Sequence, residues 1–218
     1  MTAWILAGWL LASGPEPGLD HRLAALPGLV DASGYVPDLR VQLMYGTSQN
    51  FIGRAVYQGL TRCFLVRDAA QMLGRARSWL KMRQPGWTFV AYDCVRPRSV
   101  QRAMWATVRG TPAQSYVASP AGTASLHNYG CAIDVGLVNE RGAPADMGTS
   151  FDHFGRKAEP RHEAQLRRNG LLSPEALANR LLLREVMTRA GFIPISNEWW
   201  HFNCATPDEV RARYPIVE

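Results

Sequence analysis

Two stretches of the chain repeat apolar residues with the period of an α-helix. In residues 67–82, RDAAQMLGRARSWLKM, one face is apolar and basic residues occupy the other. Residues 174–190, PEALANRLLLREVMTRA, are preceded by Ser173 and followed by Gly191. Serine is a favoured helix N-cap, and glycine is favoured just past a helix end. We therefore predict a helix over each stretch, and a third over residues 100–109 that Ser99 caps.

Two other stretches alternate in the manner of a β-strand. Residues 88–96 alternate up to Pro97, which cannot continue the ladder of hydrogen bonds. Residues 131–137, CAIDVGL, turn their larger apolar side chains to one face and Asp134, with small neighbours, to the other. A third stretch, residues 192–203, is predicted as a final strand. The segments predicted to be rich in loops are residues 36–57 and 139–172.

Strands precede, separate and follow the predicted helices without a regular βαβ order. This order favours the α+β class, with a central and mainly antiparallel sheet flanked by helices. A chain of 218 residues with 47% hydrophobic content can bury one substantial core. We therefore predict a single domain over residues 19–218.

The first 18 residues are predicted to stand apart from this domain. Residues 3–12, AWILAGWLLA, are apolar throughout but too short to span a bilayer, so no stable membrane span is expected. Their length fits the apolar region of a secretory signal, and small residues follow, although a basic start is missing. We expect a periplasmic or secreted protein. The alternative is a cytoplasmic protein whose N-terminal extension packs on the core.

Charge and cysteine content narrow the possible partners. The formal net charge is +6, but the basic residues are scattered singly and in pairs without interleaved aromatic residues, so no nucleic-acid partner is expected. The four cysteines contain no CxxC pair, which argues against a cysteine-bound zinc ion. They either form disulfides, if the protein is exported, or remain buried thiols. The four are Cys63, Cys94, Cys131 and Cys204.

Two candidate metal ligands lie within the sequence SLHNYGCAID, and a third lies near the end of the chain. His127 and Asp134 flank a glycine turn, and His201 lies on the predicted last strand. A His-Asp-His set is one that zinc accepts, with a fourth position left for water. Glu198 is then the natural general base for that water. Because residues three apart face opposite sides of a strand, we place Glu198 in a bulge or in the turn before His201.

One His-Glu pair resembles a zinc-binding motif but does not complete it. His162-Glu163 begins like the zincin motif HExxH, but Leu166 stands where the second histidine is required. The chain also contains no GxSxG elbow, Walker loop or dinucleotide fingerprint.

The motifs around these candidate residues resemble those of a known family. SLHNYGCAIDVGL fits the pattern SxHxxGxAxD and EWWHF fits ExxH, both typical of the zinc D,D-peptidases. Three further stretches, MYGTSQNFIGRAVY, DCVRP and DMGTSFDHF, are similar to the VanX-type D-alanyl-D-alanine dipeptidases within that group. The resemblance implies the zinc D,D-peptidase, or hedgehog-like, fold, a zinc cofactor and a small D,D-dipeptide substrate. The role would be cell-wall turnover, vancomycin-type antibiotic resistance or nutrient recovery.

The resemblance also implies a role for each matching residue. His127, Asp134 and His201 match the zinc ligands and Glu198 the catalytic base. Arg96 matches an arginine that stabilises the oxyanion, which suits a fixed donor aimed at developing negative charge. The residues that match the substrate pocket are Tyr45, Ser125 and Asp152, with Asp152 placed to receive the substrate ammonium.

Departures from the family pattern affect the pocket rather than the catalytic groups. Val95 replaces the usual aromatic residue, Cys94 replaces a small residue, and Gly46 stands where alanine is usual. These departures leave the tolerance of other D-amino acids open. Two alternative functions also stay open: a D,D-carboxypeptidase or peptidoglycan endopeptidase of the same fold, and a zinc-stabilised binding module without turnover. The sequence does not set the oligomeric state.

Overall fold

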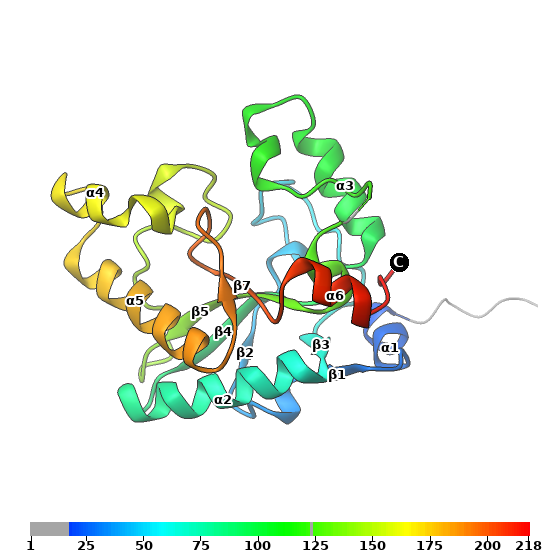
Figure 1. Ribbon diagram of the computed structural model, residues 1–218, viewed down its shortest axis with the longest axis horizontal. Helices are drawn as coiled ribbons and strands as arrows, with labels where there is room; N and C mark the ends of the chain where they lie inside the picture. The colour runs from blue at the N-terminus through cyan, green and yellow to red at the C-terminus, as the bar shows by residue number, and fades with distance from the viewer. Residues whose placement is uncertain (1–17, 123) are drawn as a thin grey trace, which may run out of the picture.

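A five-stranded sheet forms the centre of the protein (Figure 1). This computed structural model describes residues 18–122 and 124–218. In sheet order the strands are β2 (Arg40–Val41), β4 (Thr88–Asp93), β5 (Ala132–Val138), β7 (His201–Asn203) and β6 (Ile193–Pro194). The β2–β4 pair is parallel and the other three pairs are antiparallel. The predicted α+β class, with a mainly antiparallel sheet, is confirmed.

Strand β5 lies in the middle of this sheet and all its residues are buried. Its small residues have a packing reason. A Cβ added at Gly136 would lie 2.9 Å from the Tyr92 ring of the neighbouring strand, so only glycine leaves room for that ring. The strand therefore carries Asp134 into the interior beside closely packed neighbours.

Helices α2 (Arg67–Arg83) and α5 (Pro174–Arg189) pack together against β4 and β5. Both lie on the same side of the sheet in Figure 1. The predicted apolar face of α2 is buried from Ala69 to Leu80. At the start of α5, the Ser173 hydroxyl oxygen accepts a hydrogen bond from the Ala176 amide at 3.0 Å, as its N-cap position predicted.

The remaining elements surround this core. The other helices are α1 (Leu19–Ala24), α3 (Arg98–Val108), α4 (Glu163–Arg168) and α6 (Pro207–Arg213). A two-stranded antiparallel sheet pairs β1 (Leu29–Asp31) with β3 (Phe64–Val66). Short 3₁₀ turns are η1 (Ala32–Gly34), η2 (Met44–Gly46), η3 (Pro112–Tyr116), η4 (Leu126–Tyr129), η5 (Arg156–Ala158) and η6 (Pro160–His162). In Figure 1, α3 and α4 lie on opposite sides of the segment that leads to β7.

Two sequence expectations were wrong in detail. Helix α3 begins at Arg98, so Ser99 lies inside its first turn and does not cap it; Pro97 occupies the N-cap position. The predicted strand over residues 192–203 is a hairpin, because β6 and β7 pair with each other and the chain reverses between them. The turn-favouring pair Ser196-Asn197 lies in that reversal.

All four cysteines form disulfides, Cys63–Cys94 and Cys131–Cys204. The first joins the residue before β3 to the residue after β4. The second joins the residue before β5 to the residue after β7. The expectation of disulfides therefore replaces that of free buried thiols. The apolar stretch at residues 3–12 lies outside the described residues, and among the described helices none has the length and apolar character to cross a membrane.

Candidate active site

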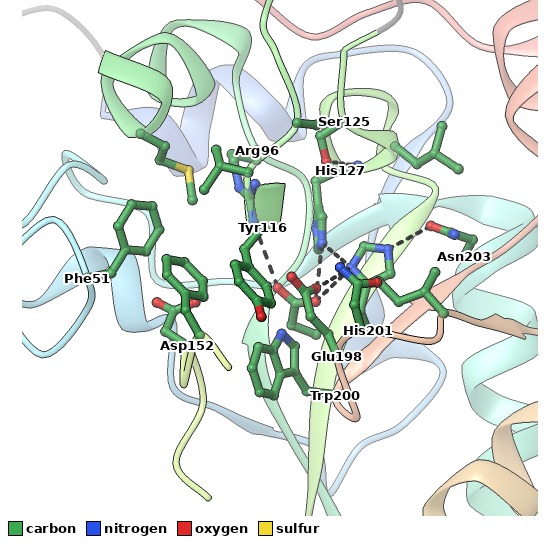
Figure 2. A pocket seen from close by; sticks show the side chains of 18 of the residues that line it. Phe51, Arg96, Tyr116, Ser125, His127, Asp152, Glu198, Trp200, His201 and Asn203 are labelled. Atoms are coloured by element: carbon green, nitrogen blue, oxygen red, sulfur yellow. Dashed lines mark hydrogen bonds and ion pairs between the residues drawn. The ribbon is translucent and has the colours of Figure 1, made fainter. Parts of the chain in front are cut away.

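Three candidate metal ligands converge where β5 and β7 lie side by side. The sheet register pairs Asp134 directly with His201, and η4 brings His127 next to both. The Asp134 Oδ1 atom lies 3.0 Å from His201 Nδ1 and 3.3 Å from His127 Nε2. The two imidazole nitrogens are 3.2 Å apart. Figure 2 shows the His127 and His201 side chains pointing toward each other.

The turn that delivers His127 is fixed by its own sequence. Ser125 caps η4, and the Asn128 side chain bonds back to the Ser125 amide to complete a capping box. Gly130 then takes the left-handed conformation, with φ of 68°. A Cβ there would lie 2.8 Å from the Leu29 side chain, so glycine is needed for conformation and for space. The turn therefore sets the separation of the first two candidate ligands.

Each histidine has a partner on its other ring nitrogen. His127 Nδ1 lies 2.7 Å from the Cys94 carbonyl oxygen, and His201 Nε2 lies 2.8 Å from Asn203 Oδ1. The second contact is made by the amide oxygen of Asn203, which is an acceptor. Carbonyl oxygens only accept, so these ring nitrogens carry protons, and the facing nitrogens are the ones that can bind a metal ion. Sequence reasoning missed Asn203. Its position could have been inferred, because residues two apart in a strand, such as His201 and Asn203, point to the same face.

The donor set fits a metal ion. The ligand atoms of His127, Asp134 and His201 all lie within 4.8 Å of one another. Burial alone raises the pKa of the Asp134 carboxyl, but the two adjacent imidazoles outweigh it and hold that pKa well below its usual range. A divalent cation that displaces the protons between these groups would find two imidazole nitrogens and one carboxylate oxygen as its ligands.

Glu198 lies in the loop between β6 and β7, as the strand geometry predicted. Its Oε2 atom is 3.9 Å from His201 Nδ1. Burial is the main cause that raises the pKa of Glu198 to about 8. Trp200, which is 2% exposed, packs edge-on against Trp199 and forms the expected wall behind this acid.

Arg96 is held rigidly at the other side of the ligand set. Its Nε and Nη2 groups both donate to Asp93 Oδ2, and Nη1 donates to Gln101 Oε1 at 2.8 Å. The Asp93 carboxylate is completely buried. Two of the five N–H groups of the guanidinium are not used in these bonds, and Nη2 lies 3.8 Å from Asp134 Oδ2. The charge is therefore fixed in place with donors to spare.

Asp152 forms a second acidic position in the same cavity. The Tyr45 hydroxyl donates to its Oδ1 at 2.8 Å, while Oδ2 is buried and has no hydrogen-bond partner among the described residues. The backbone of Asp152 has φ of 59°, an uncommon conformation for a residue other than glycine. Burial is the largest cause that raises the pKa of Asp152 to about 7.

One cavity of about 320 Å³ contains all eight residues singled out in the sequence. They are Tyr45, Arg96, Ser125, His127, Asp134, Asp152, Glu198 and His201. The discarded pair lies elsewhere: His162 contacts Glu159, and Glu163 accepts from Arg184. Sequence reasoning missed the aromatic lining residues Phe51, Tyr116 and Phe154, which lie in segments without a periodic pattern.

A metal-ligand set with an acid on one side and a fixed cation on the other is the arrangement of a metallopeptidase. Comparison with known proteins narrows the class. A family model described as "D-ala-D-ala dipeptidase" matches residues 26–217. The chain belongs to this metallopeptidase family and has the zinc D,D-peptidase fold that the sequence motifs predicted.

Individual relatives agree with the family match. A D-alanyl-D-alanine dipeptidase of Escherichia coli is 35% identical over 189 residues, which cover 87% of this chain and 89% of the relative. One from Enterococcus faecium is 37% identical over 188 residues, covering 77% of this chain and 86% of the relative. One from Synechocystis is 26% identical over 178 residues, covering 68% of this chain and 72% of the relative.

Proposed function

We propose that the protein is a zinc-dependent dipeptidase that hydrolyses D-alanyl-D-alanine. The observation that carries this proposal is the single cavity that holds the His-Asp-His set, Glu198, Arg96 and Asp152 together. The relatives named as D-alanyl-D-alanine dipeptidases support the choice of substrate.

In this proposal His127, Asp134 and His201 hold the zinc ion. Their donors are the nitrogen and oxygen types that catalytic zinc takes, and three protein ligands leave a position open. When bound, the ion lowers the pKa of a water molecule to about 7 and polarises the scissile carbonyl group. The partners on the far ring nitrogens, described above, keep both imidazoles oriented for this task.

Glu198 is the proton carrier in this proposal. Its carboxylate takes the proton of the attacking water and delivers it to the amine that leaves. Arg96 faces the negative charge that develops on the carbonyl oxygen during attack. Because Asp93 and Gln101 hold the guanidinium, its free N–H groups need not be reoriented as the charge grows.

The two ends of a free dipeptide require opposite partners. Asp152 offers a buried carboxylate oxygen that no group in the described part of the chain bonds to, which suits the substrate ammonium group. Ser125, on the other side of His127, is our candidate for the substrate carboxylate; its hydroxyl also accepts from the His127 amide at 3.4 Å. An acid and a donor on either side of the metal site would read both termini of the substrate.

The test compares free D-Ala-D-Ala with a pentapeptide stem that ends in the same two residues. A dipeptidase releases D-alanine much faster from the free dipeptide. Preference for the pentapeptide would support the alternative, a D,D-carboxypeptidase or endopeptidase of the same fold. Binding of zinc without turnover of either substrate would leave only a binding module.

We also propose that the protein works in an oxidising compartment, the periplasm or the cell exterior. The support is the pairing of all four cysteines, since disulfides persist in such compartments and are rare in the cytoplasm. Fractionation of cells that produce the full chain tests this. Recovery of active protein in the cytoplasm with reduced thiols would contradict it.

A further inference from the structure

An aromatic chain lines one side of the cavity. The ring of Tyr116 stacks on Phe154, with centroids 5.0 Å apart and an interplanar angle of 8°. Phe154 contacts Phe51 at 5.0 Å, and Phe51 meets the ring of Tyr45 edge-on at 6.0 Å. All four rings line the cavity, and the last belongs to the tyrosine that donates to Asp152. The wall therefore runs up to the acid assigned to the substrate ammonium.

One hydrogen bond joins this wall to a separate segment. The Tyr116 hydroxyl donates to Glu159 Oε1 at 2.7 Å. Tyr116 ends η3, which follows α3, whereas Glu159 lies between η5 and η6. The bond thus connects two parts of the chain that are 43 residues apart.

The acceptor of this bond is fixed and charged. Glu159 is only 2% exposed, and its Oε2 atom lies 3.0 Å from Arg161 Nε and 3.0 Å from His162 Nε2. Burial alone would raise the pKa of Glu159, but the bonds from Arg161 and Tyr116 outweigh it and lower that pKa. A charged acceptor makes a stronger and shorter hydrogen bond than a neutral one.

The hydroxyl of Tyr116 has no part in the proposed chemistry, because it is committed to Glu159. Its ring nonetheless lies in the cavity, between Asp152 and Glu198 in the view of Figure 2. With the substrate ammonium at Asp152, as proposed above, a further residue on the amino side would meet the wall formed by the four rings of Tyr45, Phe51, Phe154 and Tyr116.

We propose that Tyr116 determines specificity by closing the amino-terminal side of the pocket against longer peptides. Its stacking on Phe154 and its hydrogen bond to Glu159 hold the ring in this position, and we call this arrangement the Tyr116 clasp. The Tyr116 clasp comprises Tyr116, Phe154 and Glu159. The inference rests on the proposed dipeptidase function. It assigns the selection of substrate length to side chains that neither bind the metal nor take part in proton transfer.

The experiment measures kcat/KM for D-Ala-D-Ala and for L-Lys-D-Ala-D-Ala, which carries one extra residue at its amino end. The ratio of extended to free substrate is compared between the wild-type protein and variants. Phe154→Ala removes the stacking partner and should raise the ratio about tenfold or more. Tyr116→Phe keeps the ring, loses the bond to Glu159 and should raise the ratio about threefold or more. Metal content and thermal unfolding verify that each variant is folded.

Tyr214→Phe is the matched control, because the Tyr214 hydroxyl also donates to a carboxylate, Asp68 Oδ2, at 2.6 Å but lies outside the cavity. Its ratio should equal that of the wild type. The clasp is overturned if the ratio is unmoved in both pocket variants, or if the wild-type protein already cleaves both substrates equally well. A wild-type protein that cleaves neither substrate overturns the dipeptidase function itself, and the clasp with it.

Discussion

Replacement of Asp152 by asparagine is expected to change how the stability of the protein depends on pH. Burial is the largest cause that raises the pKa of Asp152 to about 7 in the folded state, whereas an aspartate in an unfolded chain titrates near 3.9. The folded protein therefore binds this proton more tightly than the unfolded chain does. The sign follows: the side chain destabilises the folded state increasingly as the pH rises from about 4 to about 7.

The magnitude follows from the same two pKa values. As the pH rises from about 5 to about 8, the destabilisation of the folded state caused by this pKa shift increases by about 2–3 kcal/mol. Asp152→Asn removes the charge, keeps an oxygen that can accept from Tyr45, and tolerates the observed φ of 59° because asparagine readily adopts that conformation. The free-energy difference between variant and wild type should therefore grow in favour of the variant by about that amount over this pH range.

The assay is urea denaturation of both proteins at a series of pH values, with and without a chelator. Groups that titrate independently of Asp152 cancel in the difference, so the remaining slope belongs to Asp152 and to Glu198, whose pKa the Asp152 charge raises. Asp208→Asn, which changes a side chain that is 97% exposed, is the control and should show no slope. A flat difference for Asp152→Asn would refute the reasoning, because it would mean that this carboxyl is ionised throughout the range.

Four other changes test separate parts of the site. Glu198→Ala should retain zinc but lose turnover by about 10²-fold or more, measured by metal content and steady-state rate; retained turnover rejects the base. Arg96→Ala should lower kcat by about 10²-fold or more, and a change confined to KM would indicate simple binding instead. Asn203→Ala should weaken zinc binding about tenfold or more in competition with a chelator; unchanged affinity would show that its contact with the imidazole is dispensable. Replacement of Cys131 and Cys204 together by serine should lower the free energy of unfolding by about 2–4 kcal/mol, and an unchanged denaturation midpoint would argue against that disulfide in the working protein.

The parts of the fold that the sequence predicted are those where a single period decides the structure. Helix α5 has a cap, an opening proline and a closing glycine in the expected order, and its bounds agree with the prediction to within one residue. The hairpin of β6 and β7 was predicted as one strand because its reversal depends on pairing between the two halves. That pairing is a tertiary contact, which local alternation does not encode.

The residues of the site likewise divide into those that local sequence predicts and those that depend on tertiary contacts. His127 and Asp134 were identifiable because a short turn and a strand carry both, and Glu198 could be placed in a loop from strand geometry alone. The bond between Tyr116 and Glu159 was not predictable, since both residues lie in irregular segments far apart in the chain. Disulfide connectivity is likewise a matter of spatial proximity, so the pairing required the structure.

The most direct test of the proposed function is the rate of D-alanine release from D-Ala-D-Ala by the same purified protein before and after removal of its metal. We predict that the chelated protein is inactive, that stoichiometric zinc restores the rate, and that the free dipeptide is preferred over a pentapeptide stem. Turnover that survives complete removal of metal, or a faster reaction on the pentapeptide, would contradict this prediction.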